Sequence, residues 1–216
     1  MKKGIKFSNL IRGDSFLQTN YFKGYKYIDK AGELINIYVT KKNPLVNARV
    51  GINGLVIPKP QPNIEELKIS HQFFWMRFTD TSLDLKTFKR IYSDELKKIN
   101  KTINFEYITR IGWRNYLIYE FIKENQKEKT YKKLNFIANT ETDNVKLIIK
   151  DDLNIKASLT LQKVKRTDDE KKFALLFDLD IFSEGEFKEN GFDEITDNFY
   201  NFMNSKFLDV VNELIK

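Results

Sequence analysis

One stretch of the chain sets its fold class: Phe173-Ala174-Leu175-Leu176-Phe177-Asp178-Leu179-Asp180-Ile181. Apolar side chains recur there at every second position, which is the period of a β-strand with one buried face. Residues 193–214 then carry apolar side chains at spacings of three and four, the period of a helix with one buried face. This stripe consists of Ile195, Phe199, Phe202, Met203, Phe207, Val210, Val211 and Leu214. The two patterns predict a sheet packed against a closing helix.

Further strands are predicted upstream of this stretch. Residues 145–149 and 155–161 alternate in the same way, and the charged segment Arg166–Lys171 is predicted as a hairpin loop. A long strand is predicted over residues 105–121, either regular or bulged at Gly112.

Two helices are predicted besides the closing one. Residues 82–101 repeat apolar side chains at helical spacing, which predicts an amphipathic helix. Its N-cap candidates are Asp80, Thr81 and Ser82. The lysine-rich residues 122–142 indicate a shorter helix, because Tyr131, Leu134 and Ile137 share one face.

The N-terminal third is predicted to consist mainly of strands. The predicted strands lie at residues 5–7, 25–28, 33–39, 49–52, 55–57 and 66–78. Asp29–Gly32 and Asn53-Gly54 are predicted as hairpin turns, the second because Asn-Gly accepts positive φ. Pro58–Pro62 is predicted to break regular structure and to run as an exposed extended loop.

The order of strands, helix, strands, helix predicts an α+β fold in which antiparallel sheet packs against two amphipathic helices. Each half would hold a meander and one helix, so two similar halves are an alternative to a single undivided architecture. We predict a single domain over residues 1–216, with lobes at 1–121 and 122–216 as the other division.

Composition narrows the class of protein. The chain has 216 residues, of which 41% are hydrophobic, and its 18 Phe and 10 Tyr supply enough apolar area for a real core. It has no cysteine, which excludes disulfides, thiol nucleophiles and Cys-based metal sites. No apolar run has the length of a signal peptide or of a membrane span. We therefore predict a cytoplasmic protein with no membrane partner.

The net charge of +7 conceals an asymmetry along the chain. Residues 1–177 carry 34 Lys and Arg against 20 Asp and Glu, whereas residues 178–216 carry 3 against 10. A basic body with an acidic tail has three explanations: internal neutralisation, head-to-tail self-association, or an anionic partner on the body. The lysine runs at 127–133 and 163–172 are informative only if they cluster in space.

Few residues are candidates for catalysis or metal binding. His71 is the only histidine, so two-histidine metal sites within one chain are excluded, and no nucleotide-binding motif is present. Asp178 and Asp180 project from one face of their strand, and paired carboxylates can hold Mg²⁺; the alternative is that they are polar residues of a wet face. We predict no metal site and no cofactor, and we do not expect an enzyme.

The candidate binding residues are Arg110, Arg114 and Tyr116, which share one face of the long strand if it runs regularly. Two arginines beside an aromatic ring can grip a phosphate and stack on a base. The alternative is a cross-strand salt network with Asp178 and Asp180. A bulge at Gly112 would place the two arginines on opposite faces.

Two motifs together resemble a known family. They are Arg110-Ile111-Gly112-Trp113-Arg114 in the long strand and Asp178-Leu179-Asp180-Ile181-Phe182 before the closing helix. Over about residues 82–216 the chain resembles a sporadically distributed family of uncharacterised bacterial and archaeal proteins, in which an R-[IL]-G-x-R strand and a D-[IVL]-D-x-F strand recur. The resemblance implies architecture, and the patchy distribution of the family implies an accessory role linked to mobile elements or defence.

Our leading hypothesis is a non-enzymatic binding module whose basic surface engages an anionic partner, with nucleic acid first among the partners. The second hypothesis is a protein-interaction or self-assembly component, in which the acidic closing helix meets a basic surface and a homo-oligomer forms. A carboxylate-dependent metal enzyme using Asp178 and Asp180 is the third.

Overall fold

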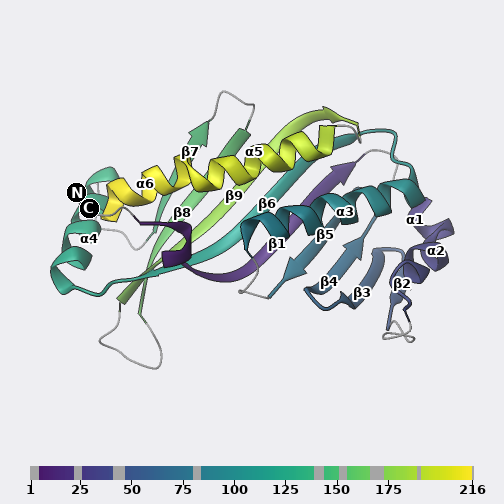
Figure 1. Cartoon of the computed structure of the whole chain (residues 1–216), viewed down its shortest axis with the longest axis horizontal. Helices are drawn as coiled ribbons and strands as arrows, with labels where there is room; N and C mark the ends of the chain where they lie inside the picture. The colour runs from purple at the N-terminus through teal and green to yellow at the C-terminus, as the bar shows by residue number, and fades with distance from the viewer. Residues whose placement is uncertain are drawn as a thin grey trace. The chain divides into compact units, whose positions relative to one another are not determined.

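The computed structural model describes residues 5–21, 26–40, 47–79, 84–138, 144–150, 155–165, 173–188 and 191–215. It is a mixed α+β fold with a large antiparallel sheet, as the sequence predicts (Figure 1). The hydrogen-bonded strand order is β2-β3-β4-β5-β1-β6-β9-β8-β7. The strands are β1 (Ile11–Tyr21), β2 (Arg49–Gly51), β3 (Gly54–Gln61), β4 (Ile64–Ile69), β5 (Phe73–Phe78), β6 (Ile108–Glu120), β7 (Asn144–Lys150), β8 (Ile155–Lys165) and β9 (Phe173–Phe187).

The described helices are more numerous than the two that the sequence predicts as sheet-packing elements. They are α1 (Lys26–Asp29), α2 (Ala31–Asn36), α3 (Leu85–Ile103), α4 (Glu124–Ala138), α5 (Phe192–Asn204) and α6 (Lys206–Ile215), with a 3₁₀ turn at Phe7–Asn9. The chain divides into two compact units. Unit 1 consists of residues 1–13, 114–181 and 198–216, and unit 2 consists of residues 14–113 and 182–197.

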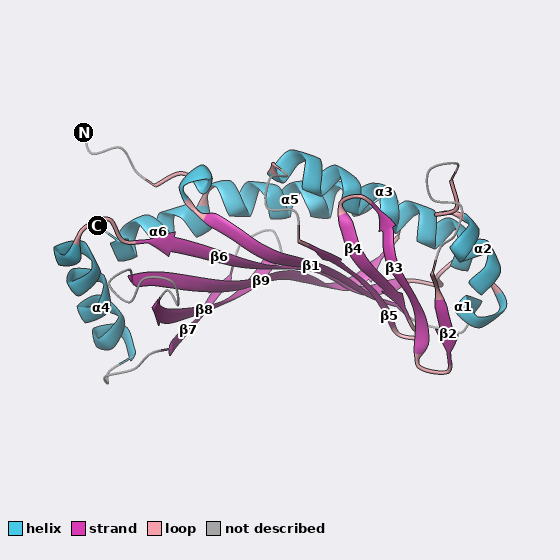
Figure 2. Ribbon diagram, turned by 90° about the horizontal axis from the view of Figure 1, so that it is seen from below, coloured by secondary structure: helices cyan, strands magenta, loops and turns pink. Residues whose placement is uncertain are grey.

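In unit 2, helix α3 covers one face of the sheet (Figure 2). Asp84 caps the helix, because its side chain accepts a hydrogen bond from the Thr87 N–H at 2.9 Å. The predicted caps at 80–82 lie outside the described residues. The Phe88 ring stacks on Trp113 of β6 at 4.7 Å between centroids and tilts against Phe78 of β5 at 4.5 Å. These rings form the centre of the core that fixes α3 to the sheet.

The N-terminal third differs from the sequence prediction at two places. The predicted hairpin around Asp29–Gly32 is wrong, because this region forms α1 and α2. Its buried side chains have the spacing of a helix and not of a strand: Tyr27, Ala31, Leu34 and Tyr38. The predicted strand at residues 5–7 is also wrong, since the 3₁₀ turn begins at Phe7 and the first strand begins at Ile11.

The hairpin at Asn53-Gly54 is confirmed, with the turn shifted by one residue. Gly51 pairs with Gly54, so Ile52 and Asn53 form the two-residue loop. Gly54 has a φ of 135°, and a Cβ there would lie 2.6 Å from the Ile69 carbonyl oxygen, so this position requires glycine.

The predicted exposed loop at Pro58–Pro62 is wrong, because β3 continues to Gln61. Of the described strands, β2 pairs with residues 54–56 of β3, and only β4 pairs with the stretch of β3 that carries the prolines. A proline without an N–H is tolerated at such a place, and the register of β3 and β4 shifts between Pro58 and Gln61. The predicted single strand at 66–78 is two strands, β4 and β5, paired as a hairpin.

In unit 1, the closing helices bury their apolar stripe as predicted. The predicted single helix is interrupted at Ser205, so α5 and α6 are separate helices. Phe199, Phe202, Met203 and Phe207 are at most 1% exposed, and Phe207 meets Phe177 of β9 edge to face at 5.9 Å between centroids. Asn212 of α6 binds both backbone groups of Ile5, which ties the N-terminal segment to this helix.

Replacing Phe207 with alanine should lower the free energy of unfolding by roughly 3–5 kcal/mol, because it removes a fully buried ring and leaves a cavity beneath α6. Denaturant unfolding of the Phe207→Ala variant measures this loss, and Leu208→Ala on the same helix is the control. A stable variant that instead loses self-association in light scattering would contradict burial.

Candidate binding surface

Arg114 of β6 is bound to Asp178 of β9 in unit 1. Its Nε donates to Asp178 Oδ1 at 2.7 Å, and its second terminal nitrogen donates to Oδ2 at 2.6 Å. The guanidinium also lies 5.2 Å from the centre of the Tyr116 ring. The hydrogen bonds with Asp178 are the main cause that raises the pKa of Arg114 above its ordinary value, and the charge of Asp180 contributes. The structure therefore brings four of the five sequence-predicted residues together.

Arg110, the fifth of these residues, has its contacts in unit 2. Its guanidinium carbon lies 4.6 Å from the centre of the Phe182 ring of β9. The same guanidinium lies over Gly112, where a Cβ would come within 2.6 Å of an Arg110 terminal nitrogen. Gly112 thus leaves room for the Arg110 side chain, and β6 runs from Ile108 to Glu120 as one strand.

These contacts give a structural account of the two motifs. Arg114 and Asp178 form one pair, Arg110 and Phe182 form another, and the intervening glycine admits the second arginine. Each pair joins the R-I-G-x-R strand to the D-L-D-x-F strand. The cross-strand network considered as the alternative to binding is therefore present between Arg114 and Asp178. In the part of the chain that the structure describes, no group of three His, Cys, Asp or Glu residues is placed to hold a metal ion.

The acidic segment at the start of α5 is paired within unit 2. Asp193 accepts hydrogen bonds from Lys97 Nζ at 2.7 Å and from the Ser93 hydroxyl, both on α3. The bond from Lys97 is the main cause that lowers the pKa of Asp193, followed by the bond from Ser93. Asp197 pairs with Lys89, which lies one turn before Ser93 on α3. Internal neutralisation therefore accounts for this part of the acidic tail.

The excess of positive charge lies mainly in one unit. Unit 2 carries 17 Lys and Arg against 16 Asp and Glu, and unit 1 carries 20 against 14. An anionic partner attracted by net charge would thus meet unit 1.

Lys163, the first residue of the second lysine run, contacts α4 in unit 1, whereas residues 166–172, including the predicted hairpin loop Arg166–Lys171, lie outside the described residues. Lys163 of β8 donates to Asn135 of α4 at 2.9 Å, and its ammonium lies 5.1 Å from the centre of the Tyr131 ring. On the same helix, Lys129 and Lys132 are exposed and have no carboxylate partner among the described residues. We call Lys129, Tyr131, Lys132 and Lys163 the lysine cluster. Lys163 lies against the Tyr131 ring, and Lys129 and Lys132 are exposed cations of the same helix as Tyr131. A cation beside an aromatic ring is a combination found in surfaces that bind nucleic acid.

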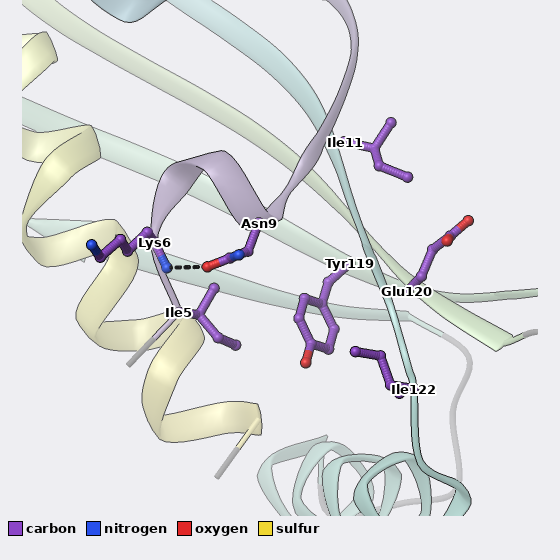
Figure 3. Close-up of a pocket in the computed structure, with 7 residues that line it drawn as sticks. All are labelled: Ile5, Lys6, Asn9, Ile11, Tyr119, Glu120 and Ile122. Atoms are coloured by element: carbon purple, nitrogen blue, oxygen red, sulfur yellow. Dashed lines mark hydrogen bonds between the residues drawn. The ribbon is translucent and has the colours of Figure 1, made fainter. Parts of the chain in front are cut away.

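A second feature of unit 1 is a mainly apolar pocket of about 610 Å³ (Figure 3). Ile5, Ile11, Tyr119 and Ile122 supply its apolar lining, and Glu120 lies beside them. Figure 3 shows Asn9 bound to the Lys6 N–H at one side of this pocket, a contact of 2.8 Å. Lys6 and Asn9 serve the local turn, and the Tyr119 hydroxyl donates to Gln126 at 3.4 Å.

In unit 2, one face of the sheet carries aromatic rings that α3 does not cover. Strand pairing places Phe16 opposite Arg77, and Gln18 opposite Trp75, on the face turned away from α3. Phe16 and Trp75 meet edge to face at 6.1 Å between centroids. The face also carries Phe73 of β5 and Lys68 of β4, whose ammonium lies 5.9 Å from the centre of the Phe73 ring. We call Phe16, Lys68, Phe73, Trp75 and Arg77 the aromatic face.

The sequence does not predict this face, because the hydropathy pattern of β1 does not indicate a strand. Its buried positions include Ser15 and Thr19, so hydropathy does not alternate clearly along the strand. Thr19 is satisfied by a 2.9 Å hydrogen bond with the Tyr92 hydroxyl of α3, which makes a polar residue acceptable in the core.

Comparison with known proteins gives no relative on which to base a function: no protein-family model matches this sequence, and no curated protein matches it. None of the described helices is long and apolar enough to cross a membrane.

The Arg114–Asp178 pair should show a coupling free energy of about 1 kcal/mol in a double-mutant cycle, because it is bidentate but its arginine is half exposed. The cycle compares the free energy of unfolding of Arg114→Ala, Asp178→Ala and the double variant. A coupling energy of zero would show that the pair does not stabilise the sheet.

Asp193→Asn should destabilise the protein at neutral pH by roughly 1 kcal/mol, a value reduced for solvent screening at this exposed site. The lowered pKa of Asp193 means that its stabilisation is present above the ordinary value of 3.8 and is lost as pH falls below it. Unfolding curves of the two proteins should therefore converge in acid. A stability difference independent of pH would contradict the ionic origin of the effect.

Proposed function

We propose that the chain is a non-enzymatic cytoplasmic binding module whose basic surface engages nucleic acid without sequence preference. The observation that supports this most is the lysine cluster, in which Lys163 of one lysine run lies against Tyr131 of the other. Phosphate groups attract such cations and release bound counterions, so this kind of binding needs no base-specific contact.

The charge distribution supports the same surface. The acidic start of α5 is occupied by Lys89 and Lys97 of its own unit and is not available to neutralise the lysine cluster. By sequence count, the excess of cations lies mainly in unit 1. Arg110 and Arg114 hold strands together in this account, and any phosphate contact that Arg114 makes would be shared with Asp178.

We also propose that the chain contains two copies of one architectural plan. Each copy runs strand, helix, meander, helix: β1, α1–α2, β2–β5, α3, and then β6, α4, β7–β9, α5–α6. In each copy an arginine and an aspartate join the first strand to the last strand of the meander. The pairs are Asp14 with Arg77 and Arg114 with Asp178, so the two residue types are exchanged between copies. A duplicated binding domain would fit the accessory role, linked to mobile elements or defence, that the family resemblance implies.

Self-association is the second candidate function, and one observation favours it. Phe136 at the end of α4 is 87% exposed, and it borders an apolar depression of about 410 Å³ with Ile137 and Leu214. An exposed aromatic beside a depression is a feature of protein interfaces. Light scattering of the unmodified chain measures this directly, and a monomer at all concentrations would remove the candidate.

Replacing Lys129, Lys132 and Lys163 together with glutamine should weaken binding to single- and double-stranded oligonucleotides. The slope of log Kd against log salt should fall by about 2, because each lost phosphate contact removes about 0.7–0.9 from it. The matched control replaces Lys86, Arg90 and Lys101, three exposed cations of α3 in unit 2, with glutamine.

The control variant should retain the binding of the unmodified protein. Equal affinity and equal salt slope in the lysine-cluster variant and the unmodified protein would contradict the proposal.

A further inference from the structure

We infer that the aromatic face of unit 2 is a stacking platform for the bases of single-stranded nucleic acid. This inference rests on the proposed function, and it names a second contact surface and a preferred form of the nucleic acid. The platform consists of Phe16, Phe73 and Trp75, with Lys68 and Arg77 beside the rings.

The position of the rings follows from strand geometry. Side chains alternate between the faces of a strand, and Phe74, Met76 and Phe78 of β5 are buried on the side of α3. Phe73, Trp75 and Arg77 must therefore face the other way, and none of the described helices covers them (Figure 2). The three side chains are partly exposed, so the ring edges and part of the ring surfaces are accessible.

Aromatic side chains on a bare sheet face are costly unless they have a partner. Trp75 lies between two polar neighbours, Gln18 on β1 and Lys68 on β4. Water alone could satisfy the hydrogen bonds of these two side chains, so they do not require an aromatic ring between them. A structural explanation accounts for part of the contact, since Phe16 supports Trp75 edge to face. It does not account for Phe73 and Trp75 of β5, which both remain partly exposed.

The charges beside the rings are mixed, because Asp14 and Glu66 lie on the same face as Lys68 and Arg77. Lys68 has no carboxylate partner among the described residues, and its ammonium is held beside Phe73. Arg77 is bound to Asp14 through Nε at 3.0 Å and through a terminal nitrogen at 2.7 Å, which fixes the guanidinium in place. Lys68, whose ammonium lies beside Phe73, can meet a phosphate while the bases lie on the rings.

The amides on β1 complete the surface. Gln18 Nε2 donates to Asn20 Oδ1 at 2.9 Å, and strand pairing places the two residues opposite Trp75 and Phe73. Amide groups accept and donate hydrogen bonds to base edges. Base edges and base faces are both accessible in a single strand, whereas a duplex conceals its base faces by stacking. Single-stranded nucleic acid is thus the form that this face can bind.

The two tryptophans make the inference directly measurable. Trp113 is 1% exposed and stacked on Phe88, so only Trp75 can report a ligand on the sheet face. Adding oligothymidylate at low salt should quench the fluorescence of the unmodified protein, and a duplex of equal length should quench it much less. In Trp75→Phe, where only Trp113 emits, the quenching should disappear.

Affinity gives the second measurement. Trp75→Ala with Phe16→Ala should weaken single-strand binding by about fivefold or more and leave the salt slope unchanged, because stacking releases no counterions. Duplex binding should not change. Ile52→Ala, which removes an exposed apolar residue from the same unit, is the matched control. Thermal unfolding shows whether the double variant is folded. If it is not folded, quenching of Trp75 fluorescence in the unmodified protein is the test of stacking.

Single-strand binding without quenching of Trp75 would overturn the stacking platform. The proposed function would stand in that case if the lysine-cluster variant binds more weakly than the unmodified protein. Failure of the protein to bind any oligonucleotide at low salt would overturn both.

Discussion

Each strand of this protein presents alternate side chains to two faces, and α3 in unit 2 and α6 in unit 1 are packed against one of them. In unit 2 the covered face is fixed by Phe88, which stacks on Trp113 and contacts Phe78. In unit 1 it is fixed by Phe207 against Phe177. Because core packing is complete on the helix side, the other face does not need apolar residues. The residues found there must be explained by strand-to-strand pairing or by a partner.

Pairing explains one group of these residues and leaves another unexplained. The Arg114–Asp178 and Asp14–Arg77 pairs each join two strands through two hydrogen bonds. The aromatic face is explained only in part by such pairing, since Phe73 and Trp75 remain partly exposed, and the lysine cluster of α4 and β8 adds the exposed Lys129 and Lys132. Together they contain the two chemical groups that a protein needs to hold single-stranded nucleic acid, namely cations for phosphates and rings for bases.

The sequence predicted those parts of the fold in which hydropathy repeats over a long stretch. Strands β7, β8 and β9 and helix α3 follow from their periods, and so does the buried face of the closing helices. The prediction for residues 26–36 was wrong because aromatic and β-branched residues favour strands in isolation. Burial of Tyr27, Leu34 and Tyr38 favours the helix instead. Strand β1 could not be predicted from hydropathy because the polar residues Ser15 and Thr19 occupy core positions.

The candidate surfaces were less accessible to prediction than the fold. The Arg114–Asp178 pair could be foreseen, because the facing of two strands places opposite charges together. The meeting of Lys163 with Tyr131, and of Phe16 with Trp75, depends on which segments become neighbours in space, and no local pattern records that.

The central claim is that this chain binds nucleic acid through cations and exposed rings. Retention of labelled single-stranded and double-stranded oligonucleotides by the unmodified protein, at low and at physiological salt, tests it most directly. The account predicts binding of both forms at low salt, weaker binding of both at physiological salt, and a preference for the single strand that persists when salt is raised. Absence of binding to either form at low salt would contradict it.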